Sequence, residues 1–166
     1  MTTSTTNAQS KLPFRLPDIG DFIPEVTEIG TALFKATGNR SIPRTTISLV
    51  HLRAGQIAYS TYQTIRHTDA LRKAGETEER ITAVATWRDA PSYFTDAERA
   101  ALALVEAVFT PNPDGERVPE DLIAQVSEHY DDKALATLTM VIAQFGFFLP
   151  IALITKPLVG VSPAEQ

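Results

Sequence analysis

One segment of the sequence gathers side chains that could carry out acid–base chemistry. Between Leu52 and Thr68, the residues Ser60, Gln63 and His67 follow one another at intervals of three and four. On a helix these side chains fall within about 60° of arc, and Gln63 and His67 are close enough to touch. His67 is a candidate general acid or base, because the unperturbed pKa of an imidazole is about 6.5. Ser60 lies about 10 Å of helix rise away from His67, which argues against a Ser–His nucleophile pair.

A structural role is the alternative for each of these side chains. His67 could equally be a histidine that is hydrogen-bonded between helices. Ser48, Ser60 and Gln63 could form a buried hydrogen-bond network instead of the polar end of a ligand pocket. Tyr62 offers a phenol near the same site, although helix packing also explains an aromatic residue at this position.

The numbers of cysteines and histidines exclude several cofactor classes. The chain has no cysteine, which removes disulfides, thiolate metal sites and dithiol redox chemistry. His51 and His129 are expected on polar helix faces, and together with His67 they lack the close spacing of a zinc site. We therefore expect no metal and no cofactor.

Composition and charge indicate a globular protein of one domain. The 166 residues are 43% hydrophobic and 21% charged, and 15 basic against 20 acidic residues give a net charge of −5. Such a charge gives no reason to expect a nucleic acid or an anionic membrane surface as a partner. We expect a disordered tail over residues 1–12, one domain over residues 13–156 and a second tail over residues 157–166. The first ten residues lack the features of a targeting signal, so a cytoplasmic protein is expected.

Helical patterns recur along the whole chain and strand alternation is scarce, which predicts an all-α bundle of about six helices. The first helix is expected after Asp21 and another from about Tyr59 to Ala74. Helix starts are also predicted at Thr77, at the capping box of Thr95 and Glu98, and at Asp131 or Asp132. These signals are local, and they leave the packing of the helices open.

The last helix is apolar enough to require a membrane test. Residues 134–155 contain no charge, and their number is sufficient for a spanning helix. Thr137, Gln144, Gly146 and Pro150 interrupt the apolar run, and neither an aromatic belt nor a cluster of basic residues flanks it. We expect a helix buried in the core or in an oligomer interface, and no membrane association.

Several further elements keep a fixed spacing between about Pro43 and Leu153. They are Leu52-Arg53, Gln56, His67-Thr68, residues 72–77, Trp87-Arg88, Phe94-Thr95, residues 98–103 and Val118-Pro119. This pattern resembles the carboxymuconolactone decarboxylase family and, within it, the AhpD-like alkylhydroperoxidases. The resemblance implies an AhpD-like helical fold and an oligomer, commonly a trimer or hexamer in that family.

The chain departs from the family pattern at its redox centre. The peroxidase members carry two cysteines, a histidine and a glutamate; here Ser60 and Gln63 stand at the cysteine positions and Ser48 at the glutamate position. Only His67 matches. A serine hydroxyl and a carboxamide cannot cycle through sulfenic acid and disulfide, so the thiol peroxidase mechanism cannot operate. Phe148 lies where the family often has a polar element, which predicts a more apolar pocket.

Other side chains of the pattern are expected to be structural. Arg53 is expected to form a salt bridge with an acid such as Glu98, the alternative partner being a substrate carboxylate. Trp87 and Arg88 belong, by the resemblance, to the shared framework. Arg66 is expected on a solvated helix face.

The residues and the resemblance together predict a family member without peroxidase activity. We expect it to bind a small apolar or aromatic molecule around His67, with Ser48, Ser60, Gln63, Tyr62 and Phe148 as binding residues. His67 would support acid–base chemistry of the decarboxylase or lactone type, a lyase reaction without a cofactor. The alternatives are an AhpD-like antioxidant alkylhydroperoxidase, as the family resemblance suggests, and a non-catalytic oligomeric scaffold.

Overall fold

The computed structural model describes residues 18–158, which contain seven α-helices, three short 3-10 helices and no strand. The all-α prediction is therefore confirmed, with one helix more than the six or so expected. The predicted tail 1–12 and residues 159–166 of the second tail lie outside the described residues. The helices are η1 (Ile19–Asp21), α1 (Glu25–Thr37), α2 (Arg44–Ile57), α3 (Thr61–Lys73), α4 (Glu78–Ala83), η2 (Val84–Thr86), η3 (Pro91–Tyr93), α5 (Asp96–Phe109), α6 (Glu120–Ser127) and α7 (Asp132–Thr155).

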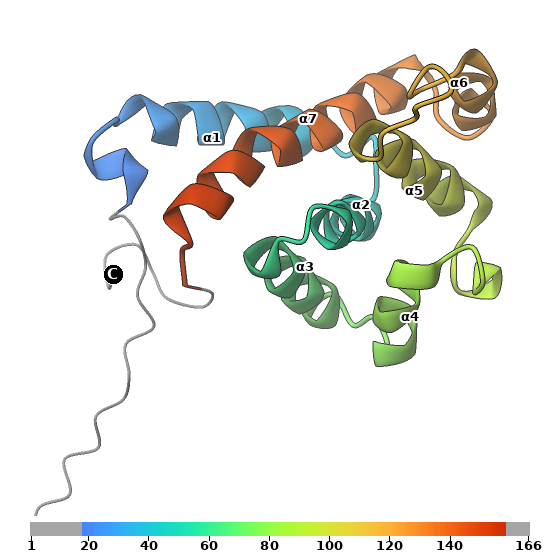
Figure 1. Cartoon of the computed structure of the whole chain (residues 1–166), viewed down its shortest axis with the longest axis horizontal. Coiled ribbons are helices and arrows are strands. Elements are labelled where there is room, and N and C mark those ends of the chain that lie inside the picture. Colours follow the sequence, from blue (N-terminus) through green and yellow to red (C-terminus); the bar gives the residue numbers. More distant parts are fainter. Residues whose placement is uncertain (1–17, 159–166) are drawn as a thin grey trace, which may run out of the picture.

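Helix α2 is the centre of the arrangement. Figure 1 shows α1 and α7 side by side, with α2 passing below α7 and α3 lying next to α2. Helix α2 contacts α3, α5 and α7, so its residues face neighbours on several sides. The region enclosed by α1, α2, α3 and α7 is where the candidate site lies.

Two hydrophobic clusters meet at α2. Val50 and Ala54, four residues apart, pack into the cluster formed with α5, α6 and α7. Leu49 and Leu52 face another way and pack against Leu71 of α3 and the α4 region. All five side chains are almost completely buried, which holds α2 in one position between the two clusters.

The predicted helix starts are confirmed where a capping side chain defines them. Thr77 accepts a hydrogen bond from the backbone N–H of Arg80, and Asp131 accepts one from the N–H of Ala134. Thr95 and Glu98 form the reciprocal capping box. These contacts involve residues three apart, so the sequence alone was sufficient to predict them.

Two predicted helix starts were too early. Helix α1 begins at Glu25 and not directly after Asp21. Helix α3 begins at Thr61 because Tyr59 adopts a left-handed backbone with φ of 52°, and Ser60 serves as the N-cap. The Ser60 hydroxyl accepts from the N–H of Gln63 at 3.4 Å. Ser60 therefore caps the N-terminal end of α3 and does not share a helix face with His67.

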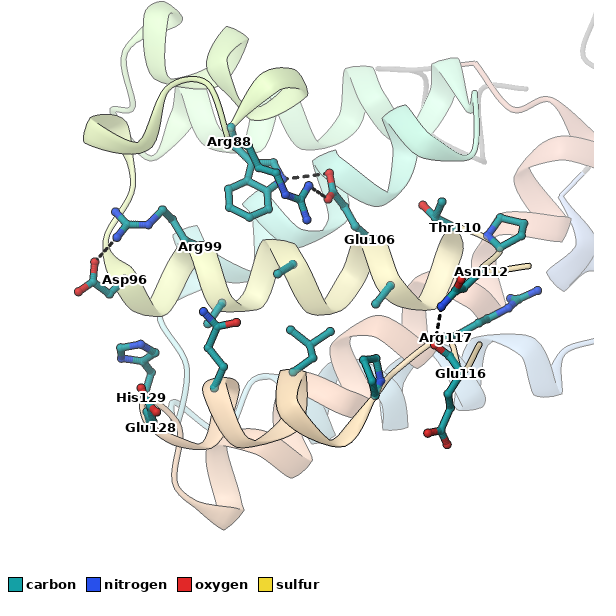
Figure 2. Close-up of a pocket in the computed structure, with 18 residues that line it drawn as sticks. Arg88, Asp96, Arg99, Glu106, Thr110, Asn112, Glu116, Arg117, Glu128 and His129 are labelled. Atoms are coloured by element: carbon teal, nitrogen blue, oxygen red, sulfur yellow. Dashed lines mark hydrogen bonds and ion pairs between the residues drawn. The ribbon is translucent and has the colours of Figure 1, made fainter. Parts of the chain in front are cut away.

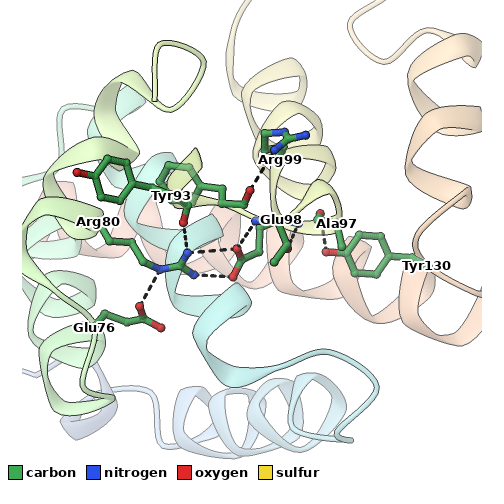
Figure 3. A network of polar contacts seen from close by, with 9 residues as sticks. Glu76, Arg80, Tyr93, Ala97, Glu98, Arg99 and Tyr130 are labelled. Atoms are coloured by element: carbon green, nitrogen blue, oxygen red, sulfur yellow. Dashed lines mark hydrogen bonds and ion pairs between the residues drawn. The ribbon is translucent and has the colours of Figure 1, made fainter. Parts of the chain in front are cut away.

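A charged network fixes α4 against α5. The Arg80 guanidinium pairs with Glu76 at 2.7 Å and with Glu98 at 2.6 Å, and it donates to the backbone oxygen of Tyr93 (Figure 3). The same guanidinium lies over the Phe94 ring at 5.3 Å. The Glu98 carboxylate also caps α5, so its partners are Arg80 and the helix terminus and not Arg53.

Helix α7 combines a bonded inner side with an apolar outer side. It has 24 residues, and a window within it has a mean hydropathy of 2.0 and is 39% buried. By length and composition this helix could cross a membrane, and a helix in the core of a soluble protein can meet the same two criteria. On the inner side, Thr137 accepts hydrogen bonds from Asn39 at 2.8 Å and Ser41 at 2.9 Å. On the outer side, Leu153 and Ile154 are exposed. The expected burial of this outer side in an oligomer stays a prediction.

Candidate functional site

Two neighbouring cavities lie between α1, α2, α3 and α7. The larger has a volume of about 590 Å³ and the smaller about 30 Å³. They share Phe34, His51, Arg66, His67 and Gln144 as lining residues. The larger volume lies within the usual range of small-molecule sites, roughly 300–1,000 Å³.

The close approach of α2 and α3 brings two histidines together in the wall of these cavities. A Cβ atom at Gly55 would lie only 3.1 Å from the backbone nitrogen of Thr64, so glycine permits this packing distance. One turn earlier on α2, the His51 ring meets the His67 ring of α3, with centroids 4.7 Å apart and planes at 62°. The site is therefore built around a pair of imidazoles and not around His67 alone.

His51 corrects an expectation of the sequence analysis. It was predicted on a polar helix face, yet it is only 7% exposed, and its Nε2 lies 2.8 Å from the backbone oxygen of Val141. Because a carbonyl oxygen only accepts, Nε2 carries the proton and Nδ1 of the neutral ring has a free lone pair. The prediction was wrong because the face of α2 that carries Ser48 and His51 forms the cavity wall.

Burial keeps both imidazoles neutral at pH 7. Desolvation lowers the pKa of His51 to about 4, although its hydrogen bond to Val141 opposes the shift. Desolvation also lowers the pKa of His67 to about 2, with further contributions from His51 and the Arg66 charge. His67 therefore offers a neutral ring, with one nitrogen that donates and one that accepts.

Several polar side chains at the site lack hydrogen-bond partners within residues 18–158. Among them are the His67 ring, the carboxamide of Gln63 and the amide nitrogen of Gln144, whose oxygen accepts from Thr37 at 3.2 Å. Gln63 and Gln144 are each 3% exposed. The unpaired nitrogen and oxygen atoms of these side chains are not completely buried within the described chain, so they are accessible from the cavities. A ligand or water in the cavities can therefore form hydrogen bonds with these atoms.

Four of the predicted site residues line the cavities. Ser48 and His67 line the larger cavity, and Gln63, His67 and Phe148 line the smaller one. The Phe148 ring stacks with Phe34 at a centroid distance of 6.2 Å, which gives the small cavity an aromatic wall. The structure therefore brings these residues from α2, α3 and α7 to one place.

Ser60 and Tyr62 line neither of these two cavities. Ser60 is 3% exposed and its hydroxyl caps α3, whereas Tyr62 is half-buried near the start of that helix. The sequence analysis missed His51, although its spacing of three residues from Ser48 on one helix was a usable signal. Arg66 is exposed, as the sequence predicted, and it also lines both cavities, which the sequence analysis did not foresee.

A larger groove of about 880 Å³ lies along α5 and α6, and its charged residues Arg88, Asp96, Arg99 and Glu106 are paired with one another (Figure 2). Glu106 accepts hydrogen bonds from Trp87 Nε1 at 3.0 Å and Arg53 Nε at 2.7 Å, and it also pairs with Arg88. Arg99 pairs with Asp96 at 2.5 Å. The expected salt bridge of Arg53 is thus confirmed, with Glu106 as the partner instead of Glu98. We place the candidate site at His51 and His67, where two imidazoles meet beside the buried side chains of Gln63 and Gln144.

The helical arrangement and the cysteine-free site define a class of protein with an AhpD-like fold and no thiol redox centre. The family model described as the carboxymuconolactone decarboxylase family matches residues 24–107. The chain belongs to the carboxymuconolactone decarboxylase family. It is 34% identical over 125 residues to the uncharacterized protein YdfG of Bacillus subtilis (strain 168). The aligned region covers 75% of this chain and 82% of that protein.

Solved structures share the same fold. A protein of unknown function from Agrobacterium tumefaciens, ATU0492, suggested to be the antioxidant defence protein AhpD, superposes with a TM-score of 0.78 at 25% identity, covering 90% of this chain and 100% of that one. The debrominase Bmp8, solved in complex with 2,3,4-tribromopyrrole, gives a TM-score of 0.73 at 17% identity, covering 87% of this chain and 75% of that one. At 17% identity the similarity to the debrominase shows the fold alone.

Proposed function

We propose that this chain binds a small molecule with an apolar body in the cavities at His51 and His67, and that His67 exchanges a proton with it. The supporting observation is the His67 ring, neutral and without a hydrogen-bond partner in residues 18–158, in the lining of a cavity of about 590 Å³. Phe34 and Ile47 supply apolar wall, and the unpaired amides of Gln63 and Gln144 supply hydrogen bonds that orient a ligand.

The reaction class that this arrangement supports is proton transfer. Without cysteine there is no dithiol to reduce a peroxide, so the redox reaction implied by the family resemblance has no residue to perform it. The low pKa makes His67 a weak base in the unliganded cavity. Negative charge that develops on a bound molecule would raise that pKa, so proton uptake by His67 is coupled to the charge formed in the reaction.

Blocking the cavity tests this proposal. Indole, benzamide and benzoate serve as probes, and the ring resonances of His51 and His67 are followed by NMR. At least one probe is expected to shift both histidines in the wild type. Ala70 lines the larger cavity, so Ala70→Trp is expected to abolish the shifts. Ala124→Trp, on the exposed side of α6, is the matched control.

Two results would contradict the proposal. The first is that none of the three probes moves either histidine in folded wild-type protein. The second is that Ala70→Trp, with a native circular dichroism spectrum, responds to the probes like the wild type. Either outcome would favour the non-catalytic scaffold.

We also propose that the chain associates with copies of itself through the outer side of α7 and the α1 region. Phe147, Leu153 and Ile154 are 37%, 41% and 59% exposed, and Ile29 of α1 is 41% exposed. Exposed apolar groups of this kind, when they form a patch, mark interaction surfaces.

Charge introduced on this surface is expected to dissociate the oligomer. Light scattering during gel filtration should give the mass of a trimer or hexamer for the wild type. Ile154→Glu should give a smaller mass, because a carboxylate would be buried without a partner at the interface. Thr82→Glu, at an exposed position of α4, should leave the mass unchanged. A wild type that is monomeric at concentrations of about 50 μM would contradict self-association.

A further inference from the structure

The two cavities at the site are very unequal in size. The larger one has a volume of about 590 Å³, whereas the smaller one has about 30 Å³, roughly the volume that one water molecule occupies in the liquid. They adjoin each other, because five residues line both. A ligand whose apolar body lies in the larger cavity can therefore extend only a very small group into the smaller one.

The smaller cavity gives access to a polar side chain that does not line the larger one. Gln63 is 3% exposed and lines only the smaller cavity, and its carboxamide has no hydrogen-bond partner within residues 18–158. His67 and Gln144 line both cavities. A neutral imidazole and a carboxamide each offer a donor and an acceptor. A hydroxyl group, which also donates and accepts, matches these partners.

Phe148 of α7 bounds the smaller cavity and does not line the larger one. Its ring stacks with the Phe34 ring of α1, with centroids 6.2 Å apart, and meets the Phe147 ring edge-on at 5.1 Å. The tip of the ring lies against α1 at Gly30, where a Cβ atom would be 3.7 Å from Phe148 Cζ. Contacts with two rings and with α1 therefore hold the Phe148 ring in place, and it cannot turn toward α1 to enlarge the cavity.

Phe145 forms the other aromatic wall of the smaller cavity, but it belongs to the core. It is 2% exposed, and its ring contacts those of Phe109 at 5.3 Å and His51 at 5.9 Å. Phe148 is half-buried and belongs to neither hydrophobic cluster. Of the two phenylalanines that line only the smaller cavity, Phe148 is therefore the one that sets its size independently of the core.

We propose that Phe148 is a specificity-determining residue, which limits the group placed beside Gln63 and His67 to one heavy atom, the oxygen of a hydroxyl. This inference rests on the proposed function and specifies which molecules the site accepts: an apolar body that carries a hydroxyl, as in a phenol or an alcohol. Arg66 also lines the smaller cavity, and its charge would suit an anion. A carboxylate, however, has three heavy atoms and needs more room than about 30 Å³ provides.

Phenol and benzamide test this inference, because both are neutral at pH 7 and share a ring but differ in the size of the polar group. In NMR spectra, the side-chain amide of Gln63 reports the smaller cavity and the ring of His51 reports both cavities. In the wild type, phenol is expected to shift the resonances of Gln63 and His51. Benzamide is held in the larger cavity and is expected to shift His51 alone.

Two substitutions of Phe148 change the size of the smaller cavity in opposite directions. Phe148→Ala removes the ring, so benzamide should shift Gln63 and bind roughly fivefold or more tightly than to the wild type. Phe148→Trp fills the cavity, so phenol should no longer shift Gln63 but should still shift His51 from the larger cavity. Phe22→Ala, at a phenylalanine that is 71% exposed and lines neither cavity, is the matched control and should respond like the wild type. Circular dichroism establishes that each variant is folded.

The outcomes separate this inference from the proposed function. The size limit is wrong if phenol leaves Gln63 unshifted in the wild type, or if benzamide shifts it there. It is also wrong if benzamide fails to shift Gln63 in folded Phe148→Ala, or if phenol still shifts it in folded Phe148→Trp. Each of these results leaves the small-molecule site intact, provided that a probe shifts the histidines. If no probe, indole and benzoate included, shifts a histidine or Gln63 in the wild type, the inference and the proposed function are both wrong.

Discussion

Replacing Glu106 by alanine is expected to lower the free energy of unfolding by about 3–5 kcal/mol. Glu106 is 8% exposed, and its carboxylate accepts from Trp87 Nε1 at 3.0 Å and pairs with Arg53 at 2.5 Å and with Arg88. Removing the carboxylate leaves the half-buried Arg53 guanidinium and the buried indole N–H without their common acceptor. Since Arg53 belongs to α2 and Glu106 to α5, the variant also weakens the connection between α5 and the central helix.

Urea unfolding followed by circular dichroism measures this loss. For a chain of this size each 1 kcal/mol corresponds to a fall in Tm of about 2–4 °C, so Glu106→Ala should melt roughly 6–20 °C lower. Glu106→Gln keeps an acceptor oxygen for the indole N–H and should lose less. Glu116→Ala, exposed at the same groove, should stay within about 0.5 kcal/mol of the wild type. A loss below about 1 kcal/mol in Glu106→Ala would contradict the role assigned to this network.

The helices could be predicted from the sequence because their determinants are local. Thr77, the Thr95 and Glu98 pair, and Asp131 form capping contacts with residues three positions away. The start of α3 was missed by two residues because the left-handed backbone of Tyr59 has no strong sequence signal. This small error had a functional consequence, because it placed Ser60 on a helix face instead of at the cap.

The site could be predicted only in part because its other half depends on how the helices pack. His67, Gln63, Ser48 and Phe148 were identified from spacing and from the family resemblance, and they line the cavities. The partner of His67 is His51, which reaches it because α2 and α3 approach closely at Gly55. The helix pattern of α2 could not show which side of the helix α3 would cover.

The arginines show the same limit more clearly. Arg66 and its charged neighbours on α3 have the sequence pattern of a solvated face, and Arg72 indeed pairs with Glu78 on the surface at 2.5 Å. Only the positions of α1 and of the loop before α2 make Arg66 part of a cavity wall with Arg40 and Arg44. A charge pattern in sequence therefore identified surface residues but not the concave part of that surface.

Acidification from pH 7 to pH 5 is expected to destabilise the protein by about 4 kcal/mol through His51 and His67 together. Their folded-state pKa values of about 4 and about 2 lie below the 6.5 of an unperturbed histidine. Below pH 6.5 the unfolded chain therefore binds more protons than the folded one. The contribution of the neutral rings to stability is complete above pH 6.5 and is lost as the pH falls, by about 1.4 kcal/mol per pH unit for each ring.

Variants that cannot titrate should remove this dependence. Urea unfolding at pH 7 and pH 5, at one protein concentration, is expected to show about half the wild-type loss in His67→Phe and about half in His51→Gln. Glutamine at position 51 offers an amide N–H that can replace the donor to the Val141 carbonyl. His129→Gln, a change at an exposed histidine, is the matched control and should lose as much stability as the wild type. Equal losses in all four proteins would mean that the two imidazoles are not neutral partners in the folded state, and the proton transfer proposed for His67 would lose its physical basis.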